Sequence, residues 1–283
     1  MASKNYRRKP ITKRKSNTSS RWIFYLISFV LLLIVAIGIY KFRDGFLYYL
    51  GFKTDKNVET LSKEERKLAD IRIYEVLHKH DEKAIGFDVS EYQSEIDWEQ
   101  TYHIDESFEL SFVFIRATAG KNKVDSRFKE NWKASKEREL IRGAYHYYRP
   151  NENSIEQAEN FIKTVKLQKG DLPPVLDIEK LPKSQSIDSL KVGLRRWLKK
   201  VEKHYKVKPI IYSGESYYTD FLKEEFSDYP LWIANYNFWR NHLEDDWLFW
   251  QFTEKAQIEG IEGMVDVNIF NGNKNKLLLK CIR

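Results

Sequence analysis

Runs of apolar and β-branched residues recur from residue 84 onward, each separated from the next by a more polar segment. The segments between the early runs can form helices, most clearly over residues 126–140, 154–167 and 184–205. Strands that alternate with helices predict a parallel sheet, and near-continuous apolar runs suit strands covered on both faces. The eight runs lie at residues 84–90, 112–118, 141–148, 173–179, 208–214, 230–236, 247–253 and 263–270.

Eight strands predict that the sheet closes into a barrel, so we expect an α/β, TIM-like fold over residues 83–283. This segment of about 200 residues is short for eight strands with eight full helices, because such barrels usually need about 250 residues. The helical stretch after the fifth run, residues 216–226, is also short. We therefore expect the last three helices to be reduced or missing, with an open, doubly wound sheet as the alternative fold.

An uncharged stretch of nineteen residues, 22–40, precedes this region. As a helix it would span roughly 28 Å, close to the thickness of the hydrocarbon core of a bilayer. Eight basic residues and no acidic residue lie in the first 40 positions, which orients the N-terminus toward the cytoplasm. We expect residues 22–40 to be a single transmembrane anchor that follows a basic cytoplasmic tail over residues 1–21. A cleaved signal peptide is the alternative.

Residues 41–82 are highly charged and favourable for a helix, but their apolar positions form only a ragged stripe. We expect a charged helical stalk that spaces the barrel from the membrane. The whole chain carries a net charge of +7, yet 40 basic and 41 acidic residues lie after position 40. The charge therefore does not indicate a nucleic-acid partner. A single cysteine excludes an internal disulfide.

The most informative chemistry lies in the fourth run, where Asp177 and Glu179 end the sequence PPVLDIE. Side chains two positions apart on a strand point to the same face, so both carboxylates should enter one small space. Two carboxylates held together push one pKa up and the other down, which suits a general acid beside an anionic stabiliser. Glycoside cleavage most often requires such a pair. The alternative is a strand end whose acids only form ion pairs with nearby lysine or arginine.

Polar and aromatic residues also fall at the ends of the other runs, where the active site of an α/β barrel forms. Asp88 ends the first run and Asp266 lies in the eighth, so four carboxylates from three strands converge on one mouth. Aromatic rings there, Tyr92 among them, could stack on sugar rings or could fill the core. The candidates for substrate binding are Arg116, Tyr147, Tyr212, Trp232, Tyr236 and Gln251.

Other reaction classes have little support in the sequence. It contains no His-Glu-x-x-His, Cys-x-x-Cys, glycine-rich phosphate loop or Gly-x-Ser-x-Gly motif. His146 is the only histidine at a predicted strand end. We expect it to form hydrogen bonds in the wall of the groove rather than to bind a metal, and we expect no cofactor.

Eight motifs, in order, resemble those of the glycoside hydrolase family 25 lysozymes, the Chalaropsis-type N-acetylmuramidases. The opening motif IGFDVS, the block FVFIRATAG and the Asp-x-Glu pair carry much of the resemblance. The match covers about residues 84–272, which is nearly the whole predicted barrel. The eight motifs lie within residues 85–98, 112–120, 143–147, 177–179, 211–213, 231–236, 250–251 and 265–268.

The resemblance implies a barrel of eight strands and five main helices that hydrolyses the β-1,4 bond between N-acetylmuramic acid and N-acetylglucosamine. It implies Glu179 as the general acid and Asp177 as the stabilising carboxylate, with Asp88 and Asp266 holding groups or water in place. Asp177 would either attack the sugar carbon or orient the acetamide of the substrate. The implied partners are peptidoglycan glycan strands and the bacterial inner membrane, with the catalytic domain outside the cytoplasm.

The sequence departs from the family pattern at three positions. Arg116 and Ala119 stand where the second block usually has Lys and Glu, and Ser94 stands where the first block usually has Gly. Arginine keeps the charge but not the ammonium geometry, so these changes bear on substrate preference. Two other functions stay open: a non-catalytic peptidoglycan-binding module and a related glycosidase acting on chitin-like chains.

Overall fold

The computed structural model describes residues 18–41 and 62–283, which belong to two compact units. The first unit contains α1 (Thr18–Lys41), which includes the predicted apolar segment. Its stretch Trp22–Lys41 has a mean hydropathy of 2.8, so it is long and apolar enough to cross a membrane. The basic tail lies mostly outside the described residues, as does the first part of the expected stalk, residues 42–61.

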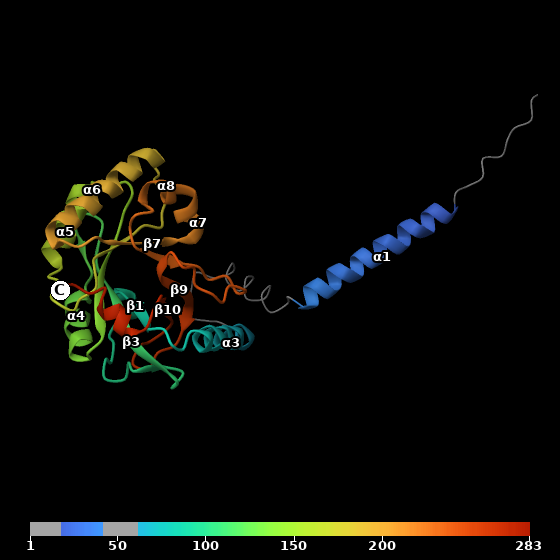
Figure 1. Ribbon diagram of the computed structural model, residues 1–283, viewed down its shortest axis with the longest axis horizontal. Helices are drawn as coiled ribbons and strands as arrows, with labels where there is room; N and C mark the ends of the chain where they lie inside the picture. Colours follow the sequence, from blue (N-terminus) through green and yellow to red (C-terminus); the bar gives the residue numbers. More distant parts are fainter. Residues whose placement is uncertain (1–17, 42–61) are drawn as a thin grey trace, which may run out of the picture. The chain divides into compact units, whose positions relative to one another are not determined.

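The second unit contains the predicted barrel, which is confirmed (Figure 1). Within the described residues, eight strands pair in the order β1-β10-β9-β8-β7-β6-β5-β3, and β1 pairs with β3 to close the ring. Two short strands, β2 (His103–Ile104) and β4 (Lys123–Val124), lie outside this ring, and each pairs with β3. The barrel strands are β1 (Ile85–Val89), β3 (Phe108–Ala119), β5 (Ile141–Tyr147), β6 (Val175–Asp177), β7 (Ile210–Gly214), β8 (Leu231–Ala234), β9 (Trp247–Ala256) and β10 (Val265–Phe270).

The direction of β10 corrects the prediction of an all-parallel barrel. β10 runs antiparallel to both β9 and β1, whereas the other barrel pairs are parallel. The connection over residues 257–264 explains the difference, because a parallel crossover needs about a dozen residues or more. The start of β10 therefore reaches the mouth where the parallel strands end. In this register Asp266 lies opposite Asp88.

Helices cover the strands unevenly, because long helices occur only in the first part of the barrel. The longest, α6, buries an apolar face that includes Leu194, Trp197 and Leu198 against the strands. As predicted, the helical segment after the fifth barrel strand is short, and β8, β9 and β10 follow one another without a long helix. The elements are η1 (Glu91–Gln93), α4 (Phe128–Glu137), α5 (Ser154–Thr164), α6 (Ile187–Tyr205), α7 (Glu215–Tyr217), η2 (Tyr218–Leu222), α8 (Lys223–Phe226) and α9 (Lys274–Leu278).

One helix before the barrel, α3 (Lys63–Lys79), differs from the stalk that the sequence predicts over residues 41–82. A capping box formed by Ser62 and Glu65 begins it. Its ragged apolar stripe, which includes Val76 and Leu77, is buried in the same core as the barrel strands. The folded body therefore includes α3, because these apolar side chains are covered by the barrel rather than by solvent.

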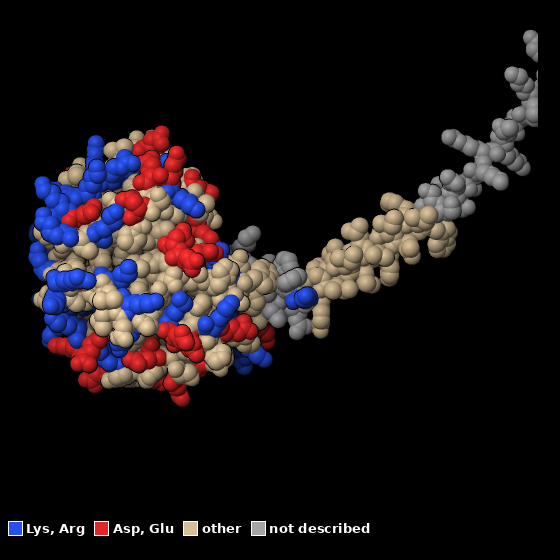
Figure 2. All heavy atoms as spheres, viewed as in Figure 1, with Lys and Arg blue, Asp and Glu red and all other residues tan. Residues whose placement is uncertain are grey.

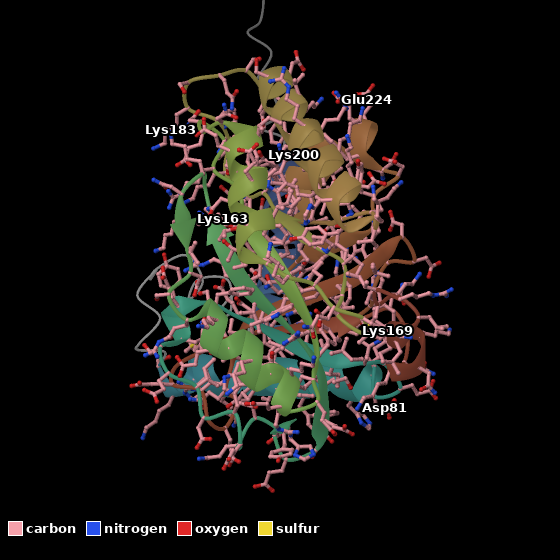
Figure 3. The ribbon with its side chains drawn as sticks, turned by 90° about the vertical axis from the view of Figure 1, so that its left-hand side faces the viewer. Asp81, Lys163, Lys169, Lys183, Lys200 and Glu224 are labelled. Carbon is pink, nitrogen blue, oxygen red and sulfur yellow. The ribbon has the colours of Figure 1, made fainter. Side chains whose placement is uncertain are left out.

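Basic side chains gather on the outer helices of the barrel. Figure 2 shows Lys and Arg concentrated over the side formed by α4, α5 and α6. Figure 3 shows Lys163 of α5 and Lys200 of α6 on this outer face. The candidate carboxylates, in contrast, lie inside the barrel mouth, so the two sets of charges are separated by the strands.

Candidate active site

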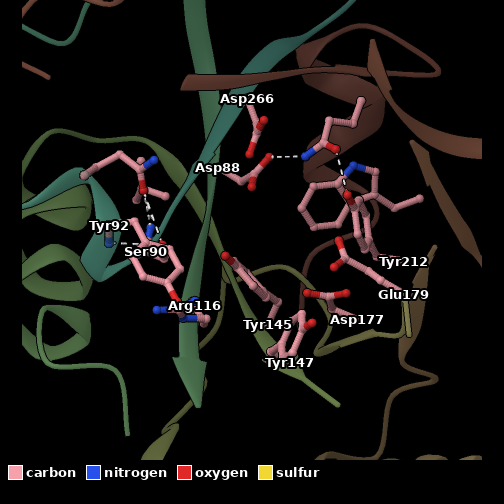
Figure 4. Close-up of a pocket in the computed structure, with 14 residues that line it drawn as sticks. Asp88, Ser90, Tyr92, Arg116, Tyr145, Tyr147, Asp177, Glu179, Tyr212 and Asp266 are labelled. Carbon is pink, nitrogen blue, oxygen red and sulfur yellow. Dashed lines mark hydrogen bonds between the residues drawn. The ribbon is translucent and has the colours of Figure 1, made fainter. Parts of the chain in front are cut away.

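A cavity of about 190 Å³ opens at the mouth of the barrel (Figure 4). All four predicted carboxylates line it, together with five of the six predicted binding residues. Tyr236 is the exception and lies in an adjoining pocket. The lining residues are Asp88, Val89, Ser90, Tyr92, Gln93, Arg116, Tyr145, Tyr147, Asp177, Glu179, Tyr212, Trp232, Gln251 and Asp266.

The end of β6 places the Asp-x-Glu pair as the strand alternation predicts. Asp177 and Glu179 face the cavity, while Ile178 between them is fully buried in the hydrophobic core. Neighbouring strands fix this backbone, since the N–H of Ile178 donates to the carbonyl of Tyr212 at 3.0 Å. On the other side, the N–H of Tyr148 donates to the carbonyl of Asp177 at 2.8 Å. Both carboxyl groups are thus held by the sheet rather than by a mobile loop.

Asp88 is held by two amide side chains. Its Oδ2 accepts hydrogen bonds from Gln251 Nε2 at 2.7 Å and from Asn268 Nδ2 at 2.8 Å. Oε1 of Gln251 accepts a hydrogen bond from the hydroxyl of Tyr212 at 2.7 Å and another from the hydroxyl of Tyr236. Gln251 therefore connects the tyrosines of β7 and the β8–β9 loop to the carboxylate of β1.

Trp232 forms the floor of the cavity rather than an open platform for a sugar. Its side chain is only 2% exposed and stacks on Phe114 with ring centres 4.3 Å apart. Its Nε1 donates to Asn268 Oδ1 at 2.8 Å. This contact orients the amide that holds Asp88, so Trp232 supports the carboxylate cluster indirectly.

Arg116 is also less accessible than a substrate-binding residue would be, at 7% exposed. Its Nε donates to Asp125 Oδ2 at 2.8 Å, and its Nη2 lies 3.0 Å from Glu91 Oε1. The guanidinium carbon lies 4.6 Å from the ring centre of Tyr92, whose side chain is 77% exposed at the rim. The structure therefore makes Tyr92 the accessible aromatic surface, with Arg116 stacked against it.

His146 does not lie in the groove wall, which corrects the prediction for this residue. It is completely buried, with Nδ1 2.7 Å from Thr118 Oγ1 and Nε2 3.1 Å from Gln157 Oε1. Its ring stacks on Trp197 of α6, and burial lowers its pKa to about 3. His146 points from β5 toward the helices because its neighbours Tyr145 and Tyr147 point into the barrel.

The sequence interpretation missed two groups near the carboxylates. Tyr145 lines the cavity, and burial raises its pKa well above the usual value, so it stays a neutral phenol. Strand alternation from Tyr147 could have identified it. Glu254 of β9 is the second group, and its charge raises the pKa of both Asp266 and Glu179. It lies beside an irregular part of the β9–β10 pairing, where simple alternation does not predict side-chain direction.

Burial controls the protonation of the cluster. It raises the pKa of Asp88 to about 7, although the amides of Gln251 and Asn268 oppose this shift. It raises the pKa of Asp177 and of Asp266 well above the usual range, and neighbouring carboxylates add to both shifts. Burial also raises the pKa of Glu179, while Lys180 lowers it. The cavity can therefore hold a protonated carboxyl beside a charged one, which is the arrangement required for general acid catalysis.

A second pocket, of about 520 Å³, adjoins the first and shares Glu179 and Tyr212 with it. Its walls come from the segment after β7 and from the loop that connects β8 to β9. The remaining lining residues are Gly214, Glu215, Ser216, Tyr217, Ala234, Asn235, Tyr236 and Asn237. Glu179 thus stands at the boundary between the acidic cavity and a wider pocket.

A barrel that gathers four carboxyl groups at the C-terminal mouth of its parallel strands is constructed like a glycoside hydrolase. The model of the family "Glycosyl hydrolases family 25" matches residues 87–261, and the chain belongs to this family. The uncharacterized protein YegX of Escherichia coli (strain K12) is 42% identical over 196 residues, which is 68% of this chain and 71% of YegX. Lysozyme M1 of Streptomyces globisporus is 32% identical over 208 residues, or 68% of this chain and 69% of the relative.

Solved structures show the same relationship. A family 25 glycosyl hydrolase from Bacillus anthracis is similar with a TM-score of 0.63 and 29% identity, over 71% of this chain and 95% of that chain. The bacterial lysozyme from Streptomyces coelicolor is similar with a TM-score of 0.63 and 28% identity, over 70% of this chain and 97% of that chain. The likeness supports a peptidoglycan-hydrolase type of site in this barrel.

The buried carboxyl groups predict that the barrel loses stability as the pH rises. The pKa of Asp88 is about 7 in the folded state against 3.8 for an unperturbed group, so the folded chain binds more protons between these values. The free energy of unfolding therefore decreases as the pH rises from about 4 to about 7. We expect Asp88→Asn to reduce the loss in free energy of unfolding between about pH 4 and about pH 7 by up to about 4 kcal/mol. Thermal melts across this pH range measure the loss.

The control for this measurement is Asp81→Asn, which alters an exposed carboxylate outside the cavity. It should leave the slope of stability against pH as it is in the unmodified chain. An Asp88→Asn variant with the full slope would contradict the role of burial at this position.

Proposed function

We propose that the chain is a peptidoglycan hydrolase that cleaves the β-1,4 bond between N-acetylmuramic acid and N-acetylglucosamine, as Chalaropsis-type N-acetylmuramidases do. The observation that carries the proposal is the convergence of Asp177 and Glu179 with Asp88 and Asp266 on one cavity, where burial raises the pKa of Glu179. Membership of family 25 and the similarity to Lysozyme M1 support the choice of substrate.

Glu179 is the general acid in this proposal. It lines both pockets, so its proton can reach an oxygen that joins a sugar in the first pocket to a sugar in the second. The sugar whose anomeric carbon reacts then occupies the acidic cavity, and the leaving sugar occupies the wider pocket. Negative charge from the cluster stabilises the positive charge that develops on the reacting sugar.

Asp177 orients the acetamide of the substrate in our proposal, rather than attacking the sugar carbon. Its Oδ1 is buried and, among the described residues, has no hydrogen-bond partner. A buried acceptor without a donor costs about 1–3 kcal/mol. An acetamide N–H from the substrate would supply that donor and hold the acetamide oxygen toward the anomeric carbon. Asp88 and Asp266 then keep water and the neighbouring groups in place.

Replacing the general acid gives the most specific test of the activity. We expect Glu179→Gln to lower kcat on peptidoglycan by about 10²–10⁴-fold, because glutamine keeps the shape but has no acidic proton to transfer. Release of new reducing ends and mass analysis of the fragments measure the rate and the bond cleaved. The control is Glu262→Gln, an exposed change away from both pockets.

Each remaining outcome has a distinct meaning. Full activity of Glu179→Gln would exclude this residue as the acid. Binding of peptidoglycan without any cleavage by the unmodified chain would indicate a non-catalytic module. Preferential cleavage of chitin-like chains in a parallel assay would indicate the related glycosidase.

The role of Asp177 can be tested with a glycoside that lacks the acetamide. We expect an activated 2-deoxy-2-fluoro glycoside to leave no sugar attached to the protein, because Asp177 orients the acetamide and does not form the covalent bond. Mass spectrometry of the intact protein measures this. A sugar adduct on Asp177 would show instead that the carboxylate is the nucleophile.

We also propose that residues 22–40 anchor the protein in the bacterial inner membrane, with residues 1–21 in the cytoplasm and the barrel outside it. The apolar length of α1 and the basic residues before it support this topology. We expect protease added to spheroplasts to digest the barrel but to spare a tag at the N-terminus. Release of the barrel by high salt without detergent would contradict the anchor.

A further inference from the structure

The helix α3 lies outside the residues that match the family, yet it packs on the body that carries the active site. Ile73, Val76 and Leu77 from one face are buried in the barrel core. The helix contacts β9 and the loop that connects β8 to β9, residues 235–246. Figure 1 shows α3 on the side of the barrel where this loop emerges.

Arg72 makes the most buried of these polar contacts, with only 2% of its surface exposed. Its Nη2 donates to the backbone carbonyl of Asn237 at 3.1 Å and also to that of Arg240. The guanidinium carbon lies 5.8 Å from the ring centre of Trp250. A buried guanidinium is tolerated only when its N–H groups have partners, so this side chain and the loop backbone constrain each other.

The end of the helix holds the same loop at a second point. Lys79 Nζ donates to Asn241 Oδ1 at 2.8 Å, and His80 Nε2 lies 3.2 Å from the backbone carbonyl of Asn241. The ring of His80 packs edge-on against Trp250 at 6.1 Å between ring centres. Contacts about two helical turns apart on α3 therefore hold the near part of the loop at Asn237 and its middle at Arg240 and Asn241.

The near part of this loop forms a wall of the second pocket. Asn235, Tyr236 and Asn237 line that pocket together with Glu215. The side chain of Asn235 donates to Glu215, and Arg240 Nη2 lies 3.1 Å from the same carboxylate. One of the two backbone carbonyls that Arg72 binds belongs to Arg240. The side chain of Arg240 in turn pairs with Glu215, which lines the second pocket.

We propose that α3 positions the β8–β9 loop for binding of the leaving sugar, with Arg72 as the positioning residue. The proposal rests on the proposed function, since it assigns the second pocket to that sugar. The loop needs such support because, in the described structure, the β8–β9 connection contains no helix that would brace it against the barrel. Connecting loops without this support are generally the more mobile parts of a fold.

The test compares Arg72→Met with the unmodified full-length chain in detergent, using soluble peptidoglycan glycan strands. Methionine keeps the apolar packing of the stem but removes the donors to the two carbonyls. We expect KM to rise by about 10-fold, the effect of losing roughly 1.4 kcal/mol of binding, while kcat stays within about twofold. Hydrogen–deuterium exchange should accelerate in residues 235–241 and stay unchanged in β1 and β6.

Two further variants make the measurement specific. Lys67→Met removes a positive charge from an exposed position of α3 and should change neither KM nor exchange. Arg72→Lys keeps one charged donor, so it should recover part of the binding and of the protection from exchange. It also keeps the test usable if Arg72→Met unfolds.

The outcomes separate this proposal from the proposed function. Faster exchange in the loop without a rise in KM would overturn the positioning role, because the loop would then not affect substrate binding. Faster exchange throughout the barrel with a proportional loss of kcat would also overturn the proposal, because α3 would then stabilise the whole barrel rather than position this loop. If the unmodified chain released no reducing ends, the proposed function would fail, whatever the exchange measurement showed.

Discussion

The burial of four carboxyl groups around one small cavity is the constraint on which this site depends. Charged carboxylates that line one cavity and are shielded from water repel one another strongly, so the cluster retains protons that isolated acids would lose. Only Asp88 is compensated by two amide donors, from Gln251 and Asn268. Burial raises the pKa of the other three acids; neighbouring carboxylates of the cluster add to the shifts of Asp177 and Asp266, and Glu254 adds to that of Glu179. This arrangement therefore lets one carboxyl group keep its proton while a neighbouring carboxylate stays charged.

The strand positions and the main acids were predictable because each depends on a local pattern. Apolar runs identified the eight barrel strands, and alternation along one strand placed Asp177 and Glu179 in the same cavity. The roles of Trp232 and Arg116 were not predictable in the same way. Whether a ring or guanidinium at a strand end faces the cavity or the interior depends on partners distant in sequence, here Phe114 and Asp125.

Two larger features depended on geometry that residue patterns do not encode. The direction of β10 follows from a connection too short for a parallel crossover, and it brings Asp266 opposite Asp88 from the start of a strand rather than from its end. The high charge of α3 indicates a solvent-exposed helix, so the sequence does not predict that it packs on the barrel. Its apolar stripe is narrow, but Arg72 is buried as well because it binds loop carbonyls, so a residue that looks solvated belongs to the interface.

The protonation state of Glu179 decides whether this residue can act as the general acid. Infrared difference spectra between the unmodified chain and Glu179→Gln, with glutamate carboxyls labelled with carbon-13, isolate this group from the aspartates. As the pH rises, the protonated-carboxyl band that the substitution removes should persist beyond the pH at which the bands of exposed glutamates disappear, because burial raises the pKa of Glu179. Disappearance of the Glu179 band together with those of exposed glutamates would contradict a raised pKa and hence the role of Glu179 as the acid.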